Sequence, residues 1–225
     1  MNDTGHARFQ KNGHSLRHNL FSTQGDTHMD TKRLIIVAVG GQGNLLASRV
    51  LGEAALLQGI PVHMSEIHGM AQRGGVVESS IVFGDAESTI ISDGEADVFV
   101  SFEPSEALRA LGRCKEETVT ITNLSPLPPF TVAIGKGVYP EIDKVTELLA
   151  NKTRRLIAFD AVKLAEEAGN VLSVNMVLLG ALIETGVLPI SADAIREAIS
   201  TKTKKAFVDV NLKAFELGFA EAAKH

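Results

Sequence analysis

Three glycines, at positions 40, 41 and 43 of the run Val-Gly-Gly-Gln-Gly-Asn, have the types and spacing that most directly indicate chemistry. Glycine has no Cβ, so it adopts positive φ and lets a phosphate or another backbone approach closely. The free amides at the start of a following helix would favour an anion. The run at 39–44 therefore predicts a ligand-facing turn between a strand and a helix. A turn required only for packing would produce the same pattern.

A second glycine-containing segment occupies residues 65–75 and reads Ser-Glu-Ile-His-Gly-Met-Ala-Gln-Arg-Gly-Gly. Arg73 stands beside Gly74 and Gly75, so this loop could offer a bidentate donor and bare backbone amides to a phosphate or carboxylate. Taken alone, the segment is better explained by a solvated surface loop with a structural arginine. Taken together with Gly40–Gly43, it favours an anion site built from two loops.

A dinucleotide-binding turn is the first alternative. The third glycine of a G-x-G-x-x-G fingerprint is missing, because Asn44-Leu45-Leu46 follows Gly43. An acidic residue does follow at a suitable distance: Glu66 closes the strand expected from Ile60 to Ser65, where a ribose-binding carboxylate would sit. A stand-alone NAD(P)-binding reductase therefore stays open as an interpretation.

Composition narrows the class of protein. The chain has 225 residues, 44% of them hydrophobic and 22% charged, as in ordinary globular proteins. Its net charge of −5, without clustered Lys and Arg, argues against a nucleic-acid partner. No run approaches the ~20 apolar residues of a membrane helix, and the N-terminus lacks a secretory signal core. We therefore expect a cytoplasmic protein with no membrane partner.

Residues 1–30 differ from the rest of the chain. They hold four of the seven histidines and show no hydrophobic periodicity, which predicts a disordered tail or a mis-assigned start. The irregular spacing of these histidines does not predict a metal site. From residue 31 to 225, strand and helix patterns alternate without a linker, which predicts a single domain.

The predicted fold is α/β: a three-layer α/β/α, Rossmann-like domain with a mostly parallel sheet. The apolar run 33–39 is typical of a central strand covered on both faces, and the alternating run 77–84 favours a mixed sheet. Further strands are expected at 76–83, 97–102, 118–122, 130–134 and 156–159. A helix is expected at 44–58, and others beginning near Pro104, Glu141, Ala161, Ser173, Ser191 and Lys204.

The two loops together resemble those of the gamma-type domain of the 2-oxoacid:ferredoxin oxidoreductases. The resemblance spans most of residues 33–185 in the right order. The His-Gly-Met-x-Gln-Arg-Gly-Gly form of the second loop is similar to the aryl-pyruvate (indolepyruvate) branch of that family. The resemblance to the family rests on the two loops and also on Leu45–Arg49, Ala96–Val98, Glu103-Pro104, Glu106-Ala107, Asn175 and Leu179–Ala181.

The resemblance implies a complex that oxidatively decarboxylates an aryl 2-oxoacid to an acyl-coenzyme A and reduces ferredoxin. Thiamine diphosphate, Mg²⁺ and iron–sulfur clusters are then expected in a large partner subunit. This chain has no Gly-Asp-Gly with a downstream Asn-Asn for the magnesium–diphosphate site. Its lone Cys114 cannot hold a cluster, which needs about four thiolates. The subunit is thus expected to bind no such cofactor alone and to complete an active site.

Coenzyme A or substrate contacts are assigned to Gly40, Gly41, Gln42, Gly43, Glu66, Arg73, Gly74 and Gly75. His68 beside Glu66 suggests acid–base chemistry, since an imidazole near a carboxylate titrates in the useful range. In this family the carbanion chemistry belongs to thiamine, so a positioning or packing role for His68 is favoured. Two rival interpretations remain: the NAD(P)-dependent reductase, and a non-catalytic scaffold of the same fold.

Overall fold

Six strands form one mixed sheet in the order β2-β3-β1-β4-β5-β6. The computed structural model describes residues 1, 29–69, 75–128, 132, 134–135 and 137–225. Strands β1, β4, β5 and β6 run parallel, whereas β3 pairs antiparallel with both β1 and β2. The expected α/β architecture with a mostly parallel but mixed sheet is confirmed. The strands are β1 Lys32–Val39, β2 Val62–His68, β3 Val76–Phe83, β4 Ala96–Ser101, β5 Cys114–Asn123 and β6 Arg155–Phe159.

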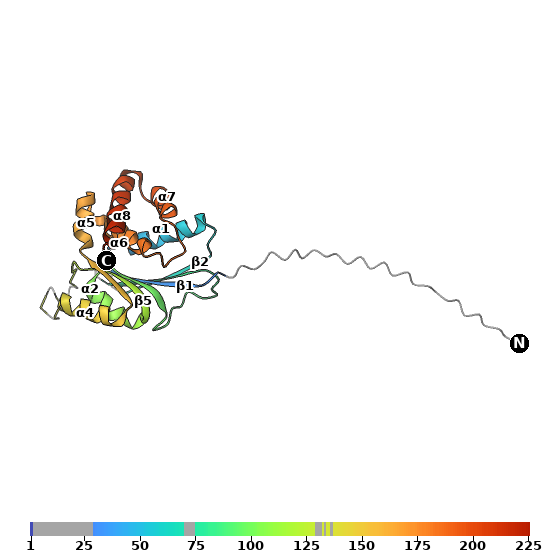
Figure 1. The fold of residues 1–225 in the computed structure, drawn as a ribbon, viewed down its shortest axis with the longest axis horizontal. Coiled ribbons are helices and arrows are strands. Elements are labelled where there is room, and N and C mark those ends of the chain that lie inside the picture. Colours follow the sequence, from blue (N-terminus) through green and yellow to red (C-terminus); the bar gives the residue numbers. More distant parts are fainter. Residues whose placement is uncertain (2–28, 70–74, 129–131, 133, 136) are drawn as a thin grey trace.

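Helices cover both faces of the sheet (Figure 1). Helices α2 (Pro104–Ala110) and α4 (Ile142–Lys152) lie on one face. The other face carries α1 (Asn44–Leu57), α5 (Ala161–Ala168), α6 (Val174–Glu184), α7 (Ala192–Lys202) and α8 (Val208–Ala222). The described residues include three short 3₁₀ turns: η1 (Leu111–Arg113) between α2 and β5, η2 (Val171–Ser173) between α5 and α6, and η3 (Lys205–Phe207) between α7 and α8. Two hydrophobic cores result, one on each side of the sheet.

Helix α6 is apolar on every side because it is buried on every side. All of its residues from Val174 to Ile183 are buried. It packs so closely against α8 that a Cβ on Gly218 would lie 1.8 Å from the carbonyl oxygen of Val177. Glycine at this crossing lets the backbones of α6 and α8 come into contact on the face of the sheet that carries five helices.

The topology brings the ligand-facing loops to one edge. Because β1, β4, β5 and β6 are parallel, their carboxyl ends lie along the same edge of the sheet, where open α/β sheets usually bind ligands. Strand β3 returns antiparallel between β1 and β2, so the loop before β3 reaches this edge as well. The two loops singled out in the sequence therefore meet.

Several sequence expectations need correction. The strand expected at 130–134 is wrong at its described residues, since Val132 is helical and Ile134 lies in a turn; the other three lie outside the described residues. Strands β5 and β6 pair directly, which leaves no place between them for another strand. Strand β2 runs on to His68, so Glu66 does not close it. The helix expected from Lys204 begins as η3, and α8 follows at Val208.

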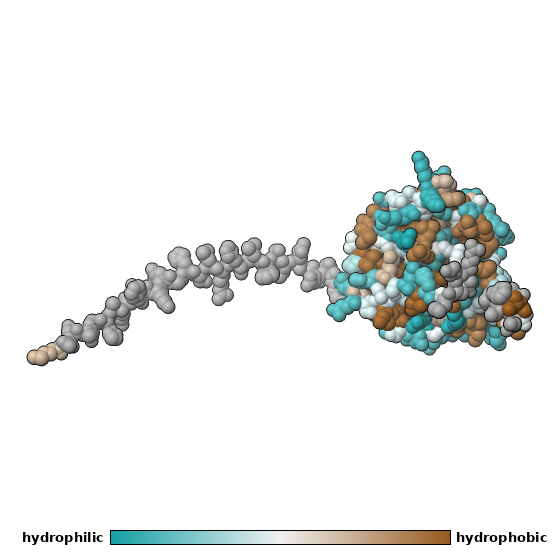
Figure 2. Space-filling model, turned by 180° about the vertical axis from the view of Figure 1, so that it is seen from behind, coloured by the Kyte–Doolittle hydropathy of each residue, from teal (hydrophilic) through white to brown (hydrophobic). Residues whose placement is uncertain are grey.

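Figure 2 shows one face of the molecule, coloured by hydropathy. There, apolar and polar residues interleave in small patches. Within the described part of the chain, no helix is long and apolar enough to cross a membrane.

Candidate functional site

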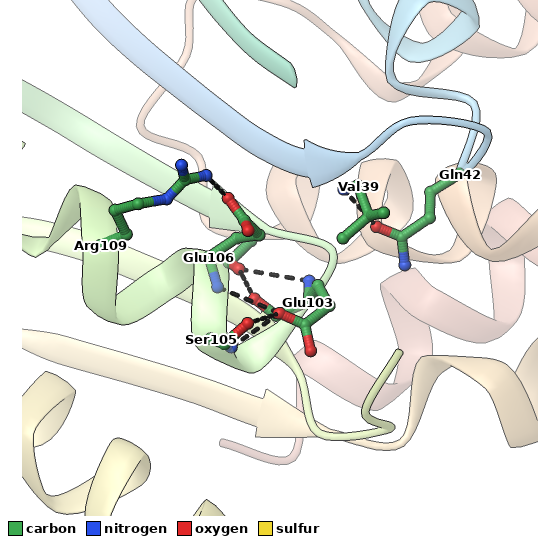
Figure 3. Close-up of polar contacts among 7 residues, drawn as sticks. Val39, Gln42, Glu103, Ser105, Glu106 and Arg109 are labelled. Carbon is green, nitrogen blue, oxygen red and sulfur yellow. Dashed lines mark hydrogen bonds and ion pairs between the residues drawn. The ribbon is translucent and has the colours of Figure 1, made fainter. Parts of the chain in front are cut away.

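The glycine turn between β1 and α1 is held by its own glutamine. Gly41 and Gly43 take φ of 104° and 83°, a left-handed conformation that glycine adopts without strain. The Gln42 side chain folds back, and its Oε1 accepts from the Val39 amide at 2.8 Å (Figure 3). Its Nε2 donates to the Phe102 carbonyl at 3.1 Å. Gln42 thus ties the turn to the end of β4.

Gly43 sits against Asn175, a buried residue of α6. The Asn175 Nδ2 donates to the Gly43 carbonyl at 3.2 Å, and a Cβ on Gly43 would lie only 2.7 Å from that same nitrogen. Gly43 also directly precedes α1. The backbone amides of Asn44 and Leu45, the first of this helix, have no acceptor within the helix, as at the start of every α-helix. Such amides are suited to an anion, and the anion site expected from the sequence stays a prediction.

The structure brings the two loops into direct contact. The Gly40 amide donates to the Gly75 carbonyl at 2.8 Å, and the Gly69 amide donates to the Val76 carbonyl at 2.7 Å. The second loop therefore starts and ends beside the glycine turn. Arg73 and Gly74 lie outside the described residues, so their assignment stays a prediction.

A chain of polar side chains extends under this contact. Asn44 Nδ2 donates to Ser79 Oγ at 2.9 Å, and Ser79 Oγ lies 3.4 Å from Glu66 Oε1. His68 Nε2 is 3.3 Å from Glu66 Oε2 and is half exposed. This series of polar side chains ends at a cavity of about 520 Å³ that is lined by both loops and by His68. Glu66 therefore contacts both Ser79 and His68, one through each carboxylate oxygen.

A larger cleft of about 670 Å³ lies on the other side of the glycine turn. One wall is the turn itself, and the opposite wall is mostly apolar. The lining residues are Gly40–Gly43, Leu46, Asn123, Ser125, Pro126, Leu127, Val162, Val171, Leu172, Val174 and Asn175. A mostly apolar cleft with a few polar groups at the carboxyl edge is the usual form of a small-molecule site.

Asn123 organises the polar edge of that cleft. It ends β5 and is buried; its Nδ2 donates to the Phe102 carbonyl at 3.0 Å, and its Oδ1 accepts from the Ala161 amide at 3.0 Å. Ser125 Oγ donates to Asp160 Oδ1 at 2.5 Å. Burial alone would raise the pKa of Asp160, but hydrogen bonds from Ser125 and nearby amides outweigh it and hold that pKa below its ordinary value. Asp160 therefore stays ionised at the cleft margin.

Glu103 is a fully buried carboxylate at the start of α2. Its Oε2 accepts from the Ser105 amide at 2.7 Å and the Glu106 amide at 3.0 Å, as a helix cap (Figure 3). Its other oxygen accepts from the Leu127 amide at 3.3 Å and from the Tyr139 hydroxyl. Burial and the bond to Glu103 raise the pKa of Tyr139 above its usual range. Glu103 thereby fixes the loop that carries Leu127 to the cleft.

The hydrogen-bonding roles of Glu103 and Asn123 are not evident from the sequence alone. The sequence marks Glu103 only as part of a Glu-Pro pair and gives Asn123 no role. One signal was present for each. Glu103 comes two residues after the mostly apolar strand β4, and Asn123 is the last residue of β5, so each side chain must find partners or lie at a site.

Fold and site together define an α/β protein whose ligand-facing loops meet at the carboxyl edge of a mostly parallel sheet. The gamma subunit of a keto/oxoacid ferredoxin oxidoreductase from Geobacter sulfurreducens superposes with a TM-score of 0.63 at 25% identity, covering 86% of this chain and 99% of that one. The family model described as pyruvate ferredoxin/flavodoxin oxidoreductase matches residues 33–221, and the chain belongs to that family.

Curated relatives agree with the branch that the second loop indicated. A protein named indolepyruvate oxidoreductase subunit IorB, from Pyrococcus horikoshii, is 43% identical over 87% of this chain and 98% of its own length. The protein of the same name from Methanothermobacter thermautotrophicus is 41% identical over 85% of this chain and 97% of its own length. The resemblance seen in the sequence, and the oxidoreductase-subunit class that it implied, are confirmed.

Proposed function

We propose that this chain is the small subunit of an indolepyruvate:ferredoxin oxidoreductase. The complex would decarboxylate an aryl 2-oxoacid oxidatively, transfer the acyl group to coenzyme A and reduce ferredoxin. The observation that carries the proposal is the 43% identity to an indolepyruvate oxidoreductase subunit over nearly its whole length. The chain's own part is to shape the site where coenzyme A meets the reacting centre.

The partner is proposed to carry thiamine diphosphate with Mg²⁺ and the iron–sulfur clusters, which supply the carbanion and electron-transfer chemistry. The donor set of this chain does not fit a cluster. Its single cysteine, Cys114, is buried at the start of β5, and burial raises the pKa of its thiol to about 11. A buried thiol of this kind is a poor source of the thiolate that clusters require.

Coenzyme A is proposed to lie in the cleft beside the glycine turn. The first amides of α1 are suited to a negatively charged group, and the apolar wall suits an uncharged chain. Arg73 with Gly74 and Gly75 is proposed to contact an anionic group of coenzyme A or the substrate carboxylate, because the contact between Gly40 and Gly75 anchors this loop beside the turn. His68 is proposed to help position substrate, held by Glu66.

The test is an Arg73→Ala variant of the assembled complex. The Michaelis constant for coenzyme A or for the oxoacid should rise about tenfold or more, the loss typical of a charge-assisted hydrogen bond. Arg154→Ala is the matched control, since Arg154 is exposed and directly precedes β6, at the opposite edge of the sheet. Unchanged constants for both substrates would rule out the anion site.

The NAD(P)-dependent reductase is the less favoured function. In the doubly wound dinucleotide fold the second strand lies next to the first, so that its acidic residue reaches the ribose. Here β3 separates β2 from β1, and Glu66 lies beside Ser79 and His68. The reductase would bind NAD(H) without a partner, and a scaffold protein would bind no thiamine-containing partner. Purifying the chain with its bound partners distinguishes both alternatives from the oxidoreductase subunit.

A further inference from the structure

The two walls of the cleft beside the glycine turn are attached to the same pair of residues, Phe102 and Glu103, which join β4 to α2. From one wall, the Gln42 side chain of the glycine turn donates to the Phe102 carbonyl at 3.1 Å. From the other wall, Asn123 Nδ2 donates to that same carbonyl at 3.0 Å. One backbone oxygen therefore holds both the glycine turn and the carboxyl end of β5.

The segment 124–140, which follows β5, is called the proline loop here because it contains the prolines at 126, 128 and 129. The residues of this loop that line the cleft are Ser125, Pro126 and Leu127. The Leu127 amide, near the start of the loop, donates to Glu103 Oε1 at 3.3 Å. The Tyr139 hydroxyl, near the end of the loop, donates to the same oxygen. A single carboxylate oxygen therefore fastens both parts of the loop.

The carboxylate of Glu103 is held in one orientation. It is fully buried, and its other oxygen accepts from the amides of Ser105 and Glu106 at the start of α2 (Figure 3). Hydrogen bonds to a buried carboxylate are stronger than those between neutral groups. Removing the Tyr139 hydroxyl would leave Oε1 with the Leu127 amide as its one partner among the described residues.

We propose that Tyr139 is a positioning residue for coenzyme A: its hydroxyl, through Glu103, keeps Leu127 in place on the wall opposite the glycine turn. The inference rests on the proposed function. Tyr139 itself is not among the described residues that line the cleft, so it acts through Glu103 rather than by touching the ligand. Without its hydroxyl, coenzyme A would have to order this wall as it binds, and such ordering lowers affinity.

The test is Tyr139→Phe, which removes only the hydroxyl, with two readouts. In the assembled complex, the Michaelis constant for coenzyme A should rise about fivefold, equivalent to the loss of one ordinary hydrogen bond. Turnover at saturating coenzyme A should change less than that constant, and the constant for indolepyruvate should stay the same. In the full chain alone, the Leu127 amide should exchange its hydrogen about fivefold faster or more, because its acceptor can now move.

Thr146→Val is the matched control. It also deletes a hydroxyl, but that hydroxyl donates to the Ile142 carbonyl within α4, on the face of the sheet opposite the helices that line the cleft. An unchanged constant for coenzyme A in Tyr139→Phe, or unchanged exchange of the Leu127 amide, would overturn the inference. So would an equal rise for indolepyruvate, or the same rise in Thr146→Val. The proposed function fails separately, if the unaltered complex shows no turnover that depends on coenzyme A.

Discussion

Replacing Gly43 with alanine tests how the glycine turn is held. Two costs are expected. A side chain at φ 83° costs about 1–2 kcal/mol of backbone strain. The new Cβ would also lie 2.7 Å from Asn175 Nδ2, and overpacking of this kind costs about 1–3 kcal/mol. Gly43→Ala should therefore lower the free energy of unfolding by about 2–5 kcal/mol.

Gly41 provides a matched control two residues away. It also has positive φ, 104°, but a Cβ there would meet nothing within 4 Å among the described residues. Gly41→Ala should therefore show only the strain, about 1–2 kcal/mol. The difference between the two variants isolates the collision with Asn175.

The assay is denaturant unfolding of the purified chain and its variants, followed by circular dichroism. A double-mutant cycle adds Asn175→Ala, which removes the obstructing amide. In that background the cost of Gly43→Ala should fall to that of Gly41→Ala. Equal costs for the two glycine variants in the unaltered background would refute the close contact between the turn and α6.

Three further predictions concern stability. Gly218→Ala should destabilise the chain by about 3 kcal/mol or more in the same unfolding assay, because its Cβ would overlap the Val177 carbonyl and force α6 and α8 apart. Gly186→Ala has open space around it among the described residues but a φ of 64°, so it should cost only the backbone strain of about 1–2 kcal/mol. Burial raises the pKa of the Cys114 thiol to about 11 in the folded chain, whereas the thiol of the unfolded chain ionises near 9. The free energy of unfolding should therefore fall as the pH rises from about 9 towards 11, and Cys114→Ala should lack that slope. Rapid labelling of the folded chain by iodoacetamide at pH 8 would contradict the burial. Glu103→Ala should lower the free energy of unfolding by about 3 kcal/mol or more, because the buried groups that donate to this carboxylate would lose their acceptor. A change within about 0.5 kcal/mol of zero would contradict this hydrogen-bond network.

The fold was largely predictable because its signals are local. The apolar run of β1, the proline that opens α2 and the apolar sequence of α6 each specify an element without reference to the rest of the chain. Strand order could not be read in this way. The insertion of β3 between β1 and β2 depends on pairing between residues far apart in sequence, which no periodicity encodes.

The site was predictable only in part, for a similar physical reason. Glycines at 40, 41 and 43 indicated a turn because positive φ restricts residue type. The contact of Gly43 with Asn175, 132 residues later, required the folded chain. So did the role of Glu103, whose partners come from Leu127 and Tyr139 as well as from its own helix. Tertiary partners, rather than local pattern, determine which polar residues matter.

The most direct test of the proposed function is to reconstitute the complex without oxygen, with and without this chain. Reduction of ferredoxin should be followed with indolepyruvate and coenzyme A together, and with each one omitted. Rapid reduction should require the large partner, this chain and both substrates. Equal reduction by the partner alone, or a chain that binds no such partner but binds NAD(H) by itself, would contradict it.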